Sequence, residues 1–88
     1  DDARRWLTRA AENGYAPAML HLSDFLMTRD PVEALAWLYA SVSFAGDDAA
    51  RKRAATLAKE MTASEIDEAQ KYGRGFVKDI RERARGPG

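Results

Sequence analysis

Residues 3–22 read ARRWLTRAAENGYAPAMLHL, and residues 34–57 read ALAWLYASVSFAGDDAARKRAATL. Each stretch carries an alanine and, three residues later, a tryptophan, then reaches a glycine that favours the end of a helix, and continues with small residues. Trp6 and Trp37 stand 31 residues apart. A tandem unit of this length predicts two helical hairpins that stack on each other, because one such hairpin is too small to bury its apolar face alone.

Helical spacing and local end signals divide the chain into five predicted helices. They cover about residues 2–13, 16–28, 31–45, 48–61 and 63–85. Asp30 with Glu33, and Thr62 with Glu65, have the spacing of capping boxes, in which a side chain at the helix start and one three residues later satisfy free backbone N–H groups. Ser64 is an alternative N-cap for the last helix.

We therefore expect an all-α fold, an alpha-alpha superhelix (solenoid) in a single domain. It comprises two helix-turn-helix repeats, about residues 2–29 and 30–61, and a C-terminal capping helix at about 63–85. The stretch 34–45 is apolar on nearly every side, which predicts that it lies at the centre of the stack. Gly73 and Gly75 interrupt the last helix and predict a close helix approach or a kink.

Composition and charge limit the classes of function. The 88 residues are 45% hydrophobic and 32% charged, which is typical of a globular domain, and no apolar run approaches the roughly 18 residues of a membrane span. Cysteine is absent, so disulfides and thiolate metal sites are excluded. The net charge of zero argues against a nucleic-acid partner, so none is expected.

The chain begins at Asp1 without an initiator methionine and enters a helical pattern at once. This is typical of a fragment, a processed product or an excised piece of a longer protein, and in that case upstream repeats can be missing. Missing repeats would leave apolar surface open at the N-terminal end, from which we expect a homodimer as one mode of association. The ending Gly86-Pro87-Gly88 is expected to be disordered.

The first copy carries the pattern A-x-x-W-x-x-x-A-A-E-x-G-x-A-x-A-x-x-x-L. It does so through Ala3, Trp6, Ala10, Ala11, Glu12, Gly14, Ala16, Ala18 and Leu22. The second copy keeps Ala34, Trp37, Gly46 and Ala50 but has Ser41 and Val42 in place of the paired alanines. Over roughly residues 3 to 80 the chain resembles the Sel-one-like repeat family, relatives of the tetratricopeptide repeats, and it is similar to the C-terminal portion of bacterial members.

The resemblance implies a non-catalytic adaptor or scaffold that binds a partner protein or peptide on the repeat surface. An alternative is a regulatory or immunity-type domain that inhibits a partner enzyme by binding it. The compartment, bacterial cytoplasm or periplasm, stays open. A small hydrolase with His21 as its base is the third and weakest hypothesis, because Ser23 and Asp24 stand too near His21 on one helix to form a triad.

Candidate partner-binding residues fall into three groups. On the expected concave side lie Arg5, Arg9 and Glu12, which are equally well explained as ordinary solvated residues. Tyr39 is a candidate anchor if it proves exposed, because aromatic side chains concentrate binding energy at interfaces. The third group comprises Lys71, Arg74 and Lys78.

The third group belongs to a longer basic row on the last helix. Lys71, Arg74, Lys78, Arg81 and Arg85 recur at intervals of three and four, and residues 71–88 hold six basic and two acidic side chains. Such a row can bind an acidic protein, an anionic membrane or nucleic acid, but a solvated face stabilised by pairs such as Asp67 with Lys71 is the stronger explanation. No cofactor or metal site is expected, and both tryptophans are expected in the core.

Overall fold

The computed structural model describes residues 2–86 and consists of five helices within that range. They are α1 (Asp2–Glu12), α2 (Ala16–Leu26), α3 (Pro31–Ala45), α4 (Asp48–Ala58) and α5 (Ala63–Ala84). The described residues contain no strand, so the prediction of an all-α fold is confirmed. The disorder expected for Pro87 and Gly88 concerns residues outside the described range.

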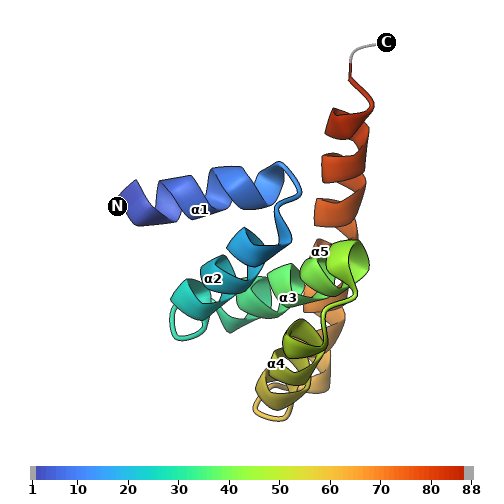
Figure 1. Ribbon diagram of the computed structural model, residues 1–88. Coiled ribbons are helices and arrows are strands. Elements are labelled where there is room, and N and C mark those ends of the chain that lie inside the picture. Colours follow the sequence, from blue (N-terminus) through green and yellow to red (C-terminus); the bar gives the residue numbers. More distant parts are fainter. Residues whose placement is uncertain (1, 87–88) are drawn as a thin grey trace.

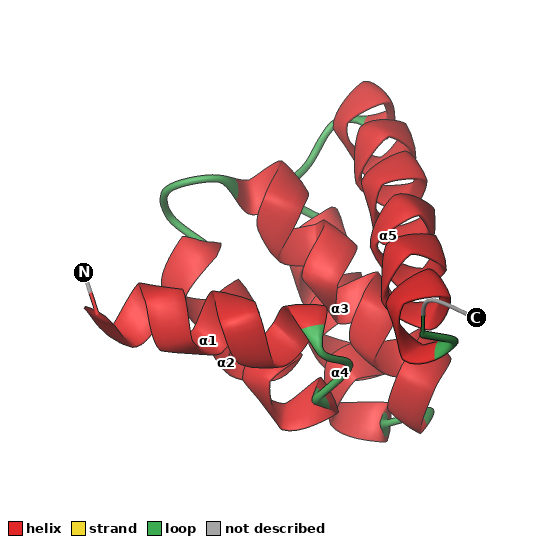
Figure 2. Ribbon diagram, turned by 90° about the horizontal axis from the view of Figure 1, so that it is seen from above, coloured by secondary structure: helices red, strands yellow, loops and turns green. Residues whose placement is uncertain are grey.

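Helix α3 is the centre of the molecule, as its uniformly apolar sequence predicts. It packs against α2, α4 and α5, whereas α1 packs mainly on α2. Figures 1 and 2 show α3 enclosed by its neighbours and α5 crossing it at the C-terminal side of the fold. Seven side chains of α3 are buried, more than in any other helix: Ala34, Leu35, Ala36, Trp37, Leu38, Ala40 and Ser41.

The two capping signals behave differently. Thr62 and Glu65 form the complete box, because the Glu65 N–H donates to Thr62 Oγ1 at 3.1 Å and the Thr62 N–H donates to Glu65 Oε1 at 2.9 Å. Asp30 Oδ1 likewise accepts the Glu33 N–H at 3.1 Å. The second half of that box is missing, since the Asp30 N–H donates to the Leu26 carbonyl at 2.7 Å instead. The prediction of a full box at Asp30 was therefore wrong.

Helices α2 and α4 end two and three residues earlier than the sequence pattern predicted, at Leu26 and Ala58. In both places the chain leaves the helix through tight turns. The Arg29 N–H donates to the Leu26 carbonyl at 2.9 Å, and the Met61 N–H donates to the Ala58 carbonyl at 3.1 Å. Each turn brings the chain directly to the N-cap of the next helix. The position of that N-cap therefore determines where the preceding helix ends.

Gly73 allows the closest approach between α3 and α5. A Cβ added there would lie 3.1 Å from the Ala36 carbonyl oxygen and 3.2 Å from Tyr39 Cβ, so the two helices are in contact through a position without a side chain. Gly75 has nothing within 4 Å of the corresponding point. The predicted close approach is therefore confirmed at Gly73 and does not occur at Gly75.

The expectation that both tryptophans lie in the core is confirmed for Trp37 and wrong for Trp6. Trp37 is 3% exposed, whereas Trp6 is 75% exposed. Trp37 is covered because α5 packs across α3. Trp6 lies on α1, which packs mainly on α2, and Figure 1 shows α1 projecting away from α5, so no following helix of the described chain covers Trp6. The two tryptophans therefore occupy equivalent positions in the sequence repeat but different environments in the fold.

Among residues 2–86, one ion pair connects the two hairpins, between α2 and α4. Arg53 Nη1 of α4 lies 2.6 Å from Asp24 Oδ1 and 2.7 Å from Asp24 Oδ2 of α2. The two side chains stand 29 positions apart in sequence, and no local pattern predicted their pairing. The contact shows that repeat packing is supported by polar as well as apolar groups.

Candidate functional site

An open groove follows the contact between α3 and the C-terminal half of α5. Its volume is about 730 Å³. From α3 it is lined by Tyr39 and Ser43, and from α5 by Gln70, Gly73, Arg74, Val77, Lys78, Arg81 and Glu82, together with Arg85 at the C-cap of α5. The side chains from α5 are mainly cationic, and Tyr39 and Val77 supply an aromatic ring and a branched aliphatic group.

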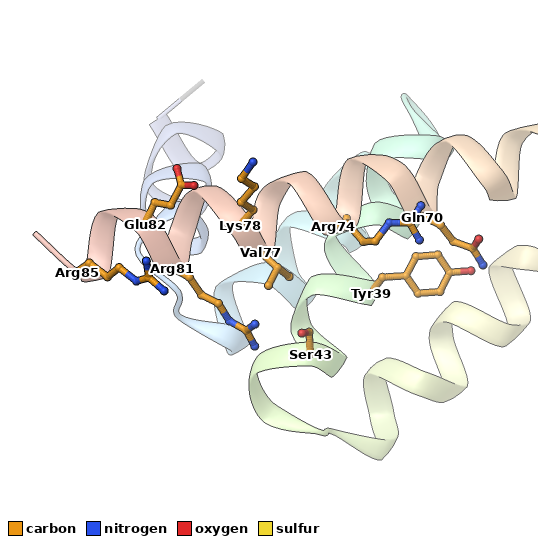
Figure 3. A pocket seen from close by; sticks show the side chains of 10 residues that line it. Tyr39, Ser43, Gln70, Arg74, Val77, Lys78, Arg81, Glu82 and Arg85 are labelled. Atoms are coloured by element: carbon orange, nitrogen blue, oxygen red, sulfur yellow. The ribbon is translucent and has the colours of Figure 1, made fainter.

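Figure 3 shows how these side chains are arranged. Arg74 and Gln70 lie beside the Tyr39 ring, and Val77 and Arg81 point toward the end of α3 near Ser43. Lys78 and Glu82 point to the other side of α5 in this view. Arg74 and Arg81 are therefore the cations that lie on either side of Val77, with Arg74 beside the Tyr39 ring.

Helix geometry and the packing of α5 explain this placement. Residues three or four positions apart on a helix share a face, so Arg74, Lys78, Arg81 and Arg85 form one row. The adjacent stripe of α5 is buried, with Ala69, Gly73 and Ile80 turned toward the core. The contact at Gly73 brings α5 so near to α3 that Tyr39, which is half-buried, becomes part of the groove.

The cations of the groove differ in their contacts. The Arg81 guanidinium lies 5.7 Å from the centre of the Phe44 ring. Within residues 2–86, Arg74, Lys78 and Arg85 make no ion pair. Lys71, by contrast, pairs with Asp67 at 3.2 Å, as the sequence predicted, and it does not line the groove. The groove therefore holds positive charge that the described chain leaves uncompensated.

The predicted partner-binding residues do not form one surface. Tyr39, Arg74 and Lys78 come together in the groove between α3 and α5. Arg5, Arg9 and Glu12 instead line a shallow hollow on α1 together with Arg4 and Thr8. The expected concave side with Arg5, Arg9 and Glu12 is therefore separate from the groove, because α1 packs mainly on α2.

Several lining residues escaped prediction as site residues. Ser43 and Gln70 are polar residues with no distinctive spacing, and only the fold brings them to the groove. Val77 is an apolar residue of the last helix that is half-buried and lines the groove. Arg81 and Arg85 belong to the basic row recognised in the sequence, which was the one signal that could have identified them.

The side chains near His21 do not form a catalytic arrangement. His21 is exposed in a hollow lined also by Trp6, Asp24 and Phe25, whereas Ser23 is fully buried. The two side chains therefore lie on different sides of α2, and Ser23 cannot serve as a nucleophile activated by His21. Among residues 2–86, no group of three or more His, Cys, Asp or Glu side chains could hold a metal ion.

No helix in the described part of the chain has both the length and the apolar character needed to cross a membrane. Comparison with models of known protein families finds no match. Comparison with curated proteins likewise finds no similar sequence.

Proposed function

We propose that this chain is a non-catalytic protein-interaction module of the Sel-one-like repeat type, which binds a partner protein through the groove between α3 and α5. The observation that carries the proposal is the combination of Tyr39 and Val77 with the unpaired Arg74 along one open groove, which Lys78 borders from the far side of α5. Protein interfaces join apolar and aromatic contacts with a polar rim, and tyrosine and arginine are enriched where binding energy is concentrated.

The scaffold supports this role. Stacked helical hairpins present extended surfaces built from neighbouring elements, and such surfaces commonly bind other proteins. The groove depends on α5, because seven of its ten lining residues belong to that helix and an eighth, Arg85, is its C-cap. The last helix therefore has two roles in this proposal: it covers the apolar side of α3, and it supplies most of the binding surface.

Site-specific photo-crosslinking tests the proposal. A photoreactive benzoylphenylalanine replaces Ser43, which is exposed in the groove, and in a matched control it replaces Ala55, which is exposed on α4 outside the groove. Each labelled protein is irradiated in a native lysate of the source organism, and captured proteins are identified by mass spectrometry. The proposal predicts a partner captured through Ser43 and absent from the Ala55 sample. Identical captures from both positions, or none, would contradict it.

A further inference from the structure

We infer that the groove between α3 and α5 binds a short acidic segment of a protein that carries an apolar side chain among its carboxylates. This inference rests on the proposed function and names the chemistry of the partner. It follows from the charge, the length and the apolar part of the groove.

Charge complementarity selects an anionic occupant. The groove is lined by four cationic side chains, Arg74, Lys78, Arg81 and Arg85, and by one carboxylate, Glu82. Arg74, Lys78 and Arg85 have no ion-pair partner within the described residues, so they are available to carboxylates. Arginine binds carboxylates through two parallel hydrogen bonds, which gives both strength and orientation.

The row of cations sets the length of the segment. Arg74 on α5 and Arg85 at its C-cap are eleven positions apart. At a rise of 1.5 Å per residue this corresponds to about 16 Å. An extended peptide spans roughly 3.3 Å per residue, so about five residues cover the row.

The apolar part of the groove favours a bound segment that carries an apolar side chain in addition to its carboxylates. Tyr39 and Val77 both line the groove, and Figure 3 shows Val77 between Arg74 and Arg81 and the Tyr39 ring beside Arg74. An aliphatic or aromatic side chain near the middle of the bound segment would remove this apolar surface from water. A segment with carboxylates on both sides of one or two apolar residues therefore fits the groove better than a run of carboxylates alone.

Two other anionic partners fit less well. A lipid bilayer is broad, so it can reach the outer cations, but it cannot contact Tyr39 in the angle between two helices. Nucleic acid is favoured by an extended positive field, whereas this chain has a net charge of zero and its basic row is short. A protein segment can satisfy both the charged and the apolar parts of the groove.

Fluorescence anisotropy with a defined probe tests the inference. The probe is a fluorescein-labelled peptide of sequence EDELFEDE, titrated with the full 88-residue chain. We expect saturable binding that Arg74→Glu and Arg81→Glu each weaken by about tenfold, since each variant replaces an attractive charge by a repulsive one. Arg83→Glu is the matched control, because Arg83 is exposed on the same helix but does not line the groove. Its effect should stay within about threefold, owing to screening at physiological salt.

Further probes separate the contribution of apolar contacts from that of charge, and distinguish a peptide from a nucleic acid or a membrane. A peptide of equal charge, EDEGGEDE, should bind about fivefold more weakly, because it lacks the apolar pair. Octathymidylate and phosphatidylserine vesicles should show no binding that depends on Arg74 or Arg81. Circular dichroism establishes that each variant is folded, which is expected because Arg74 and Arg81 are exposed.

The inference is overturned if EDELFEDE fails to bind, if Arg83→Glu weakens binding as much as Arg74→Glu, or if the oligonucleotide or vesicles bind more tightly through the groove. Failure of the inference is distinguishable from failure of the proposed function. A non-acidic protein captured through Ser43 would leave the proposed function standing while contradicting the acidic segment.

Discussion

The indole of Trp37 on α3 stacks on the ring of Phe76 on α5, with ring centroids 4.1 Å apart and an angle of 13° between the planes. The indole Nε1–H also donates a hydrogen bond to Glu33 Oε2 at 3.3 Å, so the polar edge of the ring is satisfied while its face is buried. This stack attaches α5 to the central helix and so holds one wall of the groove in place.

Trp37→Ala should therefore destabilise the protein strongly. Removal of a buried tryptophan side chain leaves a cavity and costs about 3 to 5 kcal/mol. The matched variant Trp6→Ala makes the same change at an exposed position of the first repeat and should alter the free energy of unfolding by only about 0.5 kcal/mol. Urea unfolding followed by circular dichroism measures both values. Equal losses at the two positions would mean that Trp6 is as well packed as Trp37.

The two indoles should also differ in their fluorescence. The variant Trp37→Phe leaves only Trp6, which is 75% exposed, and Trp6→Phe leaves only Trp37, which is 3% exposed. The first protein should emit at longer wavelength and be quenched efficiently by acrylamide, whereas the second should be protected from the quencher. Protection of Trp6 that increases with protein concentration would reveal self-association through α1, which is the expected location of a homodimer contact.

Gly73 and Gly75 provide a comparison within one helix. Gly73→Ala places a methyl group 3.1 Å from the Ala36 carbonyl oxygen and should destabilise the protein by about 1 kcal/mol, because a backbone atom cannot move aside easily. Gly75→Ala meets nothing within 4 Å and should stabilise α5 by about 0.5 to 1 kcal/mol through its helix propensity. Thermal unfolding of the two variants measures the difference. The packing of α5 on α3 would be in doubt if both substitutions raised the melting temperature.

The ion pair between Asp24 and Arg53 should contribute modestly. Both side chains are about half exposed, at 47% and 44%. A double-mutant cycle with Asp24→Asn and Arg53→Gln should give a coupling energy of roughly 0.5 to 1 kcal/mol that decreases as salt is added. A coupling energy of zero at low salt would show that the pair does not connect the two hairpins in solution.

The main architecture was predictable from the sequence because it follows from local chemistry. The apolar sequence of residues 34–45 predicted a central helix, and Thr62 with Glu65 predicted the start of the last one. Those signals depend on periodicity and capping, which act within a few residues. The basic row of α5 was visible for the same reason.

The site was only partly predictable because it depends on how helices are placed in space. The repeat pattern gave Trp6 and Trp37 the same role, but only Trp37 has a following helix packed across it. Tyr39 and Arg74 stand 35 positions apart and meet because Gly73 lets α5 approach α3. Such long-range contacts leave no periodic signal in a single sequence, so the groove was recognisable only in the folded chain.

Hydrogen–deuterium exchange on the complex tests the central claim, that a partner protein binds between α3 and α5. The partner identified by crosslinking at Ser43 is purified, and backbone exchange is measured with and without it. The account predicts that amides of residues 74–84, on the C-terminal half of α5, gain protection in the complex. Protection confined to α1 or α4, with exchange at residues 74–84 unchanged, would contradict it.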